Sequence, residues 1–358
     1  MFYIHKATKE LKLRKKSLFA LLAAGSLVLA GCAAEAEAPS TSSGSTDSTE
    51  SAETAPAELV ELTLAHANPS CIIFFPGYVA ATQGYFAEEG LEVNIEGLNG
   101  SGAVLQAMAA GQADIGSPGA APTILANASG QDVRYIANTA PGGLFQLVVP
   151  EASGITDASG LEGAVIGIAT ADGNEKNIAA AILAAAGVTN FDTLVVGEGA
   201  TALAGFERGD IDAYAASLDT VAYIENGGVP LTNVTGTATA YLFGNGIAAR
   251  GDYIDENPEV IAGFLRAYER AIEASLADFE LVMQGCEEYS PQEAEDRGMS
   301  EALFNAIKDS LVSPDGDVFG YNNPDYWAKV KQDLIDAGED VEAVDVTTVY
   351  TNDFLPSS

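Results

Sequence analysis

The chain has 358 residues, with 51 Asp and Glu against 16 Lys and Arg, a formal net charge of −35, and three cysteines. A surface this acidic repels nucleic acid and anionic lipid headgroups, so we expect no nucleic-acid partner. The length allows two domains at roughly 100–200 residues each.

Residues 1–31 have the pattern of a signal peptide. A basic segment precedes an apolar one, residues 17–30, that is short for a membrane span. It ends in Leu29-Ala30-Gly31-Cys32, which resembles the bacterial lipobox, where the cysteine is lipidated and becomes the first residue after cleavage. The alternative is an ordinary signal peptide with a chance cysteine. We expect lipid on Cys32 to anchor the protein on the extracytoplasmic face of the cell membrane.

Residues 32–58 contain Ser, Thr, Ala, Glu and Pro and almost nothing apolar beyond Ala. Such a segment buries too little surface to offset its ordering entropy, so we expect a disordered acidic tether. Without the leader, 10 basic and 50 acidic side chains remain, and a solvated acidic coat is the simplest explanation of this excess.

The body, residues 59–358, alternates between strand and helix patterns. Its first run predicts strands at 59–67, 91–95, 114–116 and 133–138, with helices at 77–89, 99–110 and 121–129. A second run predicts strands at 164–168, 193–196 and 211–215, with helices at 174–186, 200–208 and from Asp219 onward. Helices are also predicted at 258–280, 291–311 and 324–337. This order predicts an α/β fold with a mostly parallel sheet.

Two short segments resemble each other across the two runs. Residues 106–116 read QAMAAGQADIG and residues 204–214 read AGFERGDIDAY. In each, a glycine suited to a helix C-cap (Gly111, Gly209) precedes an aspartate (Asp114, Asp212) and a strand. We expect these aspartates to fix the turn rather than to contact ligand. The repeat suggests two similar lobes.

The sequence supports no enzyme mechanism. Beyond the leader it has a single histidine, His66, for which a structural role is expected, and no cluster with metal-ligand spacing. A Gly-x-Ser-x-Gly elbow and a Walker A loop are both missing. We therefore expect a non-enzyme without metal or cofactor. Cys71 and Cys286 either form a disulfide or remain buried thiols.

Ligands of open α/β sheets bind beyond the carboxyl ends of strands, where helices begin and offer unpaired N–H groups. Four loops have this position, at residues 70–76, 101–102, 117–119 and 170–174, and a facing segment carries Ser217 and Asp219. Core packing is the alternative for their aromatic residues and helix capping for Ser and Gly. The predicted ligand-binding residues are Phe74, Phe75, Tyr78, Ser101, Gly102, Ser117, Pro118, Gly119, Thr170, Asp172, Gly173, Asn174 and Asp219.

Four motifs in order resemble one protein family. They are GYFAEEGLEV at 84–93, GQADIG at 111–116, GDIDA at 209–213 and YTNDFLP at 350–356. The chain resembles the solute-binding proteins of ABC importers for nitrate, sulfonates, taurine and thiamine pyrimidine precursors. The resemblance implies a type II periplasmic-binding fold, in which each lobe is a mostly parallel sheet flanked by helices and a ligand cleft separates the lobes.

The same resemblance implies one lobe from 59–148 plus 245–358 and another from 149–244. Crossovers would lie near Val149-Pro150 and Gly244-Asn245. Hinge closure on a small solute would present the closed form to a permease. We expect a monomer whose partners are the solute, ABC permease subunits and, through Cys32, the membrane.

The charges of the predicted loops bear on the ligand class. None of the four loops contains Lys or Arg, whereas Asp172, Glu175 and Asp219 lie near the predicted cleft. Carboxylates disfavour an anion and accept hydrogen bonds from amino or ring N–H groups, which favours a pyrimidine-like heterocycle of the thiamine-precursor type. Sulfonate-, nitrate- or taurine-type anions are the alternative, followed by an enzyme on the same fold or a sensor module. The cysteine-rich motif of the related fungal pyrimidine synthase is missing, so its chemistry is not carried over.

Overall fold

Two five-stranded sheets organise the computed structural model, which describes residues 59–237, 241–313 and 318–356. The predicted signal peptide, the lipidation site Cys32 and the tether lie outside these residues. The first sheet has the order β2-β1-β3-β10-β4 and the second β7-β6-β8-β5-β9. The strands are β1 (Val60–His66), β2 (Leu91–Gly97), β3 (Ile115–Gly116), β4 (Val133–Ala137), β5 (Phe145–Pro150), β6 (Val165–Ile168), β7 (Asp192–Val195), β8 (Ala213–Ser217), β9 (Leu231–Asn233) and β10 (Ile247–Arg250).

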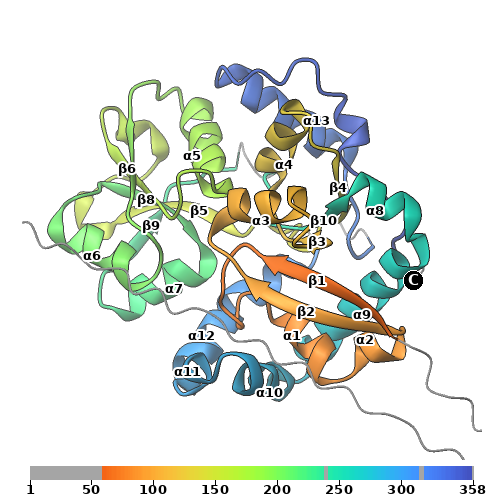
Figure 1. The fold of residues 1–358 in the computed structure, drawn as a ribbon. Helices are drawn as coiled ribbons and strands as arrows, with labels where there is room; N and C mark the ends of the chain where they lie inside the picture. The colour runs from red at the N-terminus through yellow and green to blue at the C-terminus, as the bar shows by residue number, and fades with distance from the viewer. Residues whose placement is uncertain (1–58, 238–240, 314–317, 357–358) are drawn as a thin grey trace, which may run out of the picture. The chain divides into compact units, whose positions relative to one another are not determined.

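The two sheets repeat one topology (Figure 1). In each, the first strand of the run lies between the second and third, and parallel pairing joins them. One antiparallel strand, β10 or β5, then separates the third strand from the fourth. Each sheet is therefore mixed, with one strand opposed to the rest. We call residues 145–233 the second lobe and the other described residues the first lobe.

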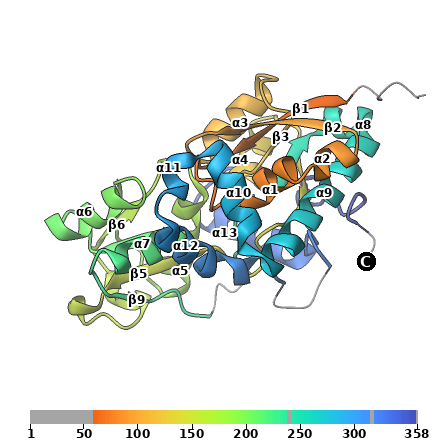
Figure 2. The ribbon, with the colours of Figure 1, turned by 90° about the horizontal axis from the view of Figure 1, so that it is seen from below.

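Helices flank both sheets. The second lobe has α5 (Asn174–Ala185), α6 (Ala200–Arg208) and α7 (Leu218–Asn226). The first lobe has α1 (Phe75–Thr82), α2 (Tyr85–Glu88), α3 (Gly100–Ala109), α4 (Ala120–Ala128), α8 (Gly251–Glu256), α9 (Pro258–Ala277), α10 (Phe279–Tyr289), α11 (Pro291–Ala294), α12 (Arg297–Ile307) and α13 (Pro324–Asp336). Figure 2 shows α10, α11 and α12 following one another beside α1, with α12 packed against α7 of the second lobe. No helix of the described ranges is long and apolar enough to cross a membrane.

The first connection between the sheets lies earlier than predicted. Strand β5 begins at Phe145 and pairs along its length with β8 and β9, so the chain crosses within residues 138–144. The predicted crossover near Val149-Pro150, and with it the predicted lobe boundary at residue 148, therefore falls inside this strand. The physical reason is that the apolar run Leu147–Val149 is buried on both faces and needs a central place in a sheet. The second connection occupies residues 234–246, a range that contains Gly244-Asn245.

Several predicted helices are interrupted. The helix predicted at 77–89 breaks at Gly84, whose φ of 75° is left-handed, and splits into α1 and α2. The helix predicted at 258–280 ends at Ala277, because Asp278 takes an extended conformation and its carboxylate accepts from the N–H of Glu280 as a new cap. A similar cap at Asp296 starts α12 inside the helix predicted at 291–311.

The repeated aspartates make the same pair of bonds in both lobes. The Asp114 carboxylate accepts from the N–H of Thr63 on β1 at 2.9 Å, and its own N–H donates to the Thr63 carbonyl at 3.0 Å. Asp212 does the same with Val165 of β6, at 2.9 Å in both directions. Each aspartate thus ties the third strand of its sheet to the first.

A disulfide links two segments of the first lobe. Cys71, just before α1, is bonded to Cys286 in α10 across 215 residues of sequence. Of the two readings that the sequence left open for these cysteines, the structure contains the disulfide. It joins the loop between β1 and α1, part of which lines the site described below, to helix α10.

Candidate functional site

A cavity lies between the lobes, at the carboxyl ends of the parallel strands. Its lining follows five strand ends, because Asn68 comes after β1, Asn99 after β2, Ala169 after β6, Glu198 after β7 and Ser217 ends β8. The lining residues are Ala67, Asn68, Ile73, Phe74, Asn99, Gly100, Ser101, Leu144, Phe145, Ala169, Thr170, Asn174, Glu175, Glu198, Ser217, Asp219 and Asn245. Its volume of about 40 Å³ leaves room for roughly three water molecules. The structure therefore shows the lobes closed, and a larger solute enters only when they separate.

The first lobe supplies an aromatic wall, the Phe74 ring, and the side-chain amides of Asn68, Asn99 and Asn245. The Phe74 ring stacks on His66 with 4.4 Å between centroids. His66 itself is fully buried behind this wall, and burial lowers its pKa to about 3, so the imidazole is neutral at physiological pH. Its Nδ1 lies 3.3 Å from the Ser117 hydroxyl. These contacts agree with the structural role expected for this histidine.

The second lobe supplies three carboxylates. Glu175 accepts from the N–H of Thr170 at 2.8 Å and from its hydroxyl at 3.2 Å. Burial raises the pKa of Glu175 and of Asp219 above their ordinary values. At the cavity mouth Glu198 keeps part of its side chain exposed and accepts from the Asn68 amide of the other lobe. Desolvation, with the charges of Asp219 and Glu175, raises the pKa of Glu198 to about 8.

Three buried polar atoms of the lining have no hydrogen-bond partner: Asn174 Nδ2, Asp219 Oδ1 and Asn245 Oδ1. The Asn174 and Asp219 side chains are only 3% and 6% exposed. An unmade hydrogen bond of a buried polar group costs about 1–3 kcal/mol, so these atoms favour a ligand that satisfies them. Together they offer one donor and two acceptors.

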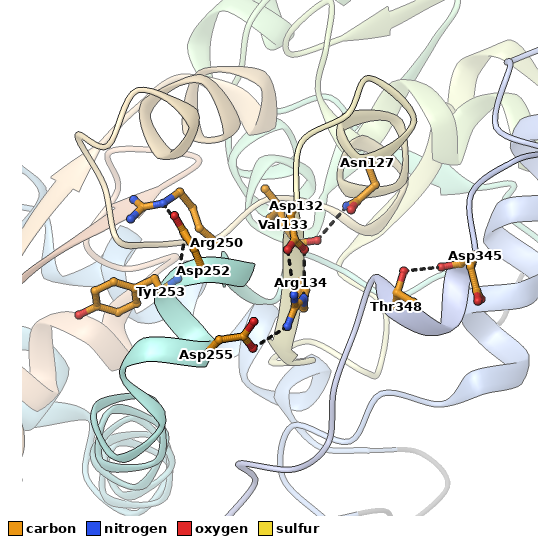
Figure 3. Close-up of polar contacts among 10 residues, drawn as sticks. All are labelled: Asn127, Asp132, Val133, Arg134, Arg250, Asp252, Tyr253, Asp255, Asp345 and Thr348. Atoms are coloured by element: carbon orange, nitrogen blue, oxygen red, sulfur yellow. Dashed lines mark hydrogen bonds and ion pairs between the residues drawn. The ribbon is translucent and has the colours of Figure 1, made fainter.

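No Lys or Arg belongs to the lining of this cavity. Two arginines of the first lobe lie at the opposite end of its strands, where β4 begins and β10 ends (Figure 3). There Arg134 pairs with Asp132 and Asp255, and Arg250 pairs with Asp252. The electrostatics of the cavity are therefore set by its carboxylates. Among the described residues, no group of three or more His, Cys, Asp or Glu is placed to hold a metal ion.

The structure brings five of the predicted site residues to the cavity, namely Phe74, Ser101, Thr170, Asn174 and Asp219. Phe75 lies instead in the core against Phe304, because adjacent residues at the start of α1 point in different directions. Tyr78 is buried one turn later, beside His66 and Tyr289. Neither side chain is among those lining the cavity.

Ser117 and Pro118 serve the loop itself. The Ser117 hydroxyl accepts from the N–H of Ala67 at 3.1 Å, and the Pro118 carbonyl accepts from the Tyr135 hydroxyl. Both residues are buried behind the cavity. They fix the loop after β3 and do not line the cavity.

The remaining predicted residues pack beside the cavity. Gly102 lies against the Asp172 carboxylate and Gly119 against the Asn174 side chain, so each glycine meets a side chain of the other lobe. Gly173 is the N-cap of α5, packed close to the Glu175 carboxylate. Gly102 and Gly119 therefore lie where the two lobes contact each other, and Gly173 packs within the second lobe.

The prediction missed Glu198, Asn99 and Asn245. Asn99 and Glu198 occupy equivalent places after β2 and β7, each followed by a glycine with positive φ, Gly100 at 85° and Gly199 at 53°. The repeat between the lobes is the signal that could have identified them together. Asn245 lies on the returning connection, where no motif marks it.

Comparison with known proteins places this arrangement in a family. Residues 72–280 match the model of the family described as NMT1/THI5 like. A relative, the riboflavin-binding protein RibY of Chloroflexus aurantiacus, is 26% identical over 340 residues, which cover 92% of this chain and 95% of the relative.

Two solved structures share the fold. The periplasmic aliphatic sulphonate-binding protein SsuA of Escherichia coli has a TM-score of 0.67 at 17% identity, with 83% of this chain and 94% of its own covered. The periplasmic nitrate-binding protein NrtA of Synechocystis PCC 6803 has a TM-score of 0.62 at 16% identity, with 83% and 87% covered. These likenesses confirm the predicted type II periplasmic-binding fold.

Proposed function

Because the chain belongs to the NMT1/THI5-like family, we propose that it is an extracytoplasmic solute-binding protein of an ABC importer. Its fold and its interlobe cavity support this role, as do the names of the relatives, which bind riboflavin, sulphonates or nitrate. The protein would capture a small solute by closing its lobes and deliver it to a permease. Lipid on Cys32 would hold this monomeric receptor near the permease at high effective concentration.

The proposed solute is a polar nitrogen heterocycle of the pyrimidine type. The single observation that carries this is the set of unpartnered atoms, Asn174 Nδ2, Asp219 Oδ1 and Asn245 Oδ1. A ring with N–H or amino donors beside a ring-nitrogen or carbonyl acceptor satisfies all three, and Phe74 offers a face for stacking. Riboflavin, named for the relative, also contains such a ring system.

Sulphonate or nitrate is the alternative that the two structural neighbours suggest. A bound anion would lie among Glu175, Glu198 and Asp219 without a cation in the lining, which is electrostatically unfavourable. For an enzymatic role the lining offers only hydroxyls beside carboxylates, such as Thr170 beside Glu175, and no His, Lys or Cys, so binding is the activity that the cavity supports best.

Thermal unfolding with added solutes tests the ligand class. The probes are the aminopyrimidine precursor of thiamine, riboflavin, an alkanesulfonate, taurine and nitrate. A true ligand at a hundred times its Kd adds about 2.7 kcal/mol and raises the unfolding temperature. We expect a shift with a heterocycle only. A shift with sulfonate, taurine or nitrate and none with either heterocycle would contradict the proposal.

A further inference from the structure

We propose that Gly119 and Asn174 set the closest approach of the two lobes: closure needs a side-chain-free position on the first lobe where Asn174 is seated. Asn174 is the first residue of α5, and Gly119 is the N-cap of α4. In Figure 1 α5 of the second lobe lies next to α3 and α4 of the first. The inference rests on the proposed receptor role only in taking lobe closure as the working motion.

The contact is too close for any other residue type at position 119. A Cβ atom added to Gly119 would lie 2.3 Å from Asn174 Cβ and 2.2 Å from its Cγ, whereas real Cβ contacts essentially never fall below 3.0 Å. The backbone does not itself demand glycine there, because φ is −79° and ψ 163°, an extended conformation open to every residue. Glycine at this position is therefore explained by the close approach of the other lobe.

Two neighbouring pairs repeat the arrangement. A Cβ on Gly102 would lie 1.7 Å from Asp172 Oδ2, and a Cβ on Gly100 would lie 2.8 Å from the Thr170 hydroxyl oxygen. Gly102 lies inside α3, where glycine costs about 1 kcal/mol relative to alanine, so it too has a reason beyond helix formation. Three glycines at the starts of α3 and α4 thus face three alternate side chains of the segment before and into α5.

Two of these pairs differ in how easily the opposing side chain can move away from an added Cβ atom. Asp172 is exposed, and its carboxylate is the far end of a rotatable side chain that can swing into solvent. Asn174 is 3% exposed, and its Cβ is fixed by the backbone of α5. An added methyl group at position 119 must therefore push the lobes apart, while one at position 102 is partly absorbed by a rotation of Asp172.

Small-angle X-ray scattering on the purified protein, measured without added solute and again with riboflavin, tests the inference, because the proposed function closes the lobes on solute. We expect Gly119→Ala to raise the radius of gyration beyond the spread of repeated measurements, and Gly102→Ala to raise it less. The double variant Gly119→Ala, Asn174→Gly removes the opposing side chain and should restore the wild-type value. Gly298→Ala is the matched control, because its Cβ would meet nothing nearer than Asp296 Oδ1 at 3.6 Å. Far-ultraviolet circular dichroism checks that each variant is folded.

An unchanged radius of gyration in folded Gly119→Ala under both conditions would overturn the inference, as would a raised value that Asn174→Gly fails to restore. Binding of the aminopyrimidine precursor and riboflavin is measured separately on the wild-type protein. If neither binds, the proposed ligand class fails, while the scattering results still decide whether these glycines control closure.

Discussion

At the scale of residues, the cavity gathers acidic groups whose ionisation is disfavoured. The pKa of Glu175, Glu198 and Asp219 is raised, chiefly by desolvation, and the three charges also oppose one another around Glu198. A solute with N–H donors would stabilise the ionised forms by donating hydrogen bonds to the carboxylate oxygens, whereas an anion would add to the repulsion. Solute choice and protonation at this site are therefore linked.

Raising the pH should destabilise the closed protein through Glu198. Its pKa in the folded state is about 8 against an ordinary 4.5, so the folded form holds a proton that the unfolded form loses. The stability from this group is fully present below about pH 4.5 and is lost as pH rises toward about 8. Urea unfolding across this range should show falling stability, and Glu198→Gln should flatten the fall. Glu207→Gln, an exposed residue of α6 in the same lobe, is the control that should leave the slope unchanged.

Replacing Asp219 by asparagine should weaken binding of the heterocycle at least tenfold, or about 1.4 kcal/mol. The change keeps the shape of the side chain and removes the charge that strengthens its hydrogen bond to a ligand N–H. Isothermal titration with the aminopyrimidine precursor and riboflavin measures the effect. Asp210→Asn, an exposed residue of the second lobe that pairs with Arg208, should leave affinity unchanged. Equal affinities for wild type and Asp219→Asn would contradict a ligand contact at this residue.

The sequence identifies those cavity residues that both follow a predicted strand and begin a predicted helix. Asn174 and Asp219 follow predicted strands and begin helices, so the position of strand ends was enough to identify them. Glu198 has the same kind of position, but one carboxylate among 51 Asp and Glu carries little signal. Phe75 is predicted in the loop before a helix that begins at residue 77, and Tyr78 in that helix. Because α1 begins at Phe75 instead, both side chains point elsewhere than expected, and sequence patterns locate helix starts poorly.

At the scale of elements, the strands that the sequence did not reveal are those that complete each sheet. Strands β5 and β10 are central and antiparallel, β9 has three residues, and none shows a run of alternating polarity. Helix α8 is only six residues long. The long apolar faces of α9 and α13 gave clear periodicity, and their predicted starts at Pro258 and Pro324 are confirmed.

The paired aspartates offer a test of the internal repeat. Asp114→Ala and Asp212→Ala should each lower the free energy of unfolding by about 1 kcal/mol, because each leaves a strand N–H without its carboxylate. The effects should add in the double variant, since the two sites lie in different sheets. Chemical denaturation measures both. Asp210→Ala, which removes only an exposed pair with Arg208, should change stability by a few tenths of a kcal/mol at most. Losses no larger than this control would show that the repeated aspartates are not structural.

Loss of the disulfide should destabilise the first lobe. Cys71 and Cys286 close a loop of 215 residues, and removal of such a link typically costs about 2–5 kcal/mol. The variant Cys71→Ala, Cys286→Ala should unfold at lower urea concentration than the wild-type protein. Adding a reductant should lower the wild-type midpoint and leave that of the double variant unchanged. Two alkylatable thiols in the unreduced wild-type protein would contradict the disulfide.

At the scale of the whole molecule, the lobes are tied together twice. The chain passes between the sheets before β5 and again before β10, and each crossing delivers the strand that lies antiparallel in the sheet it enters. Two adjacent connections restrict relative motion to bending about them, which is the motion that opening of the cavity requires. The short repeat suggests two similar lobes, but the predicted first crossing lies too late in the chain, because β5 resembles an ordinary buried segment.

The large negative charge makes a prediction for the entire chain. At a formal charge of −35, repulsion among carboxylates opposes the compact state more than the unfolded one. Ion pairs would respond to salt in the opposite direction, but those of the described residues are largely exposed, worth about 0–1 kcal/mol each, and already use most of the basic side chains outside the leader: Arg134, Arg208, Arg250, Arg266, Arg270, Arg297 and Lys329.

Repulsion therefore dominates, and screening it should stabilise the protein. Raising NaCl from about 0.01 M to about 0.15 M shortens the Debye length from about 30 Å to about 8 Å, so the unfolding temperature should rise over this range. Sodium perchlorate at the same low concentrations should act alike, since screening depends on ionic strength, whereas effects on apolar hydration differ between anions. A rise with chloride alone would assign the effect to hydration. An unfolding temperature that is flat or falling with both salts would show that the acidic surface carries no net repulsion in the folded state.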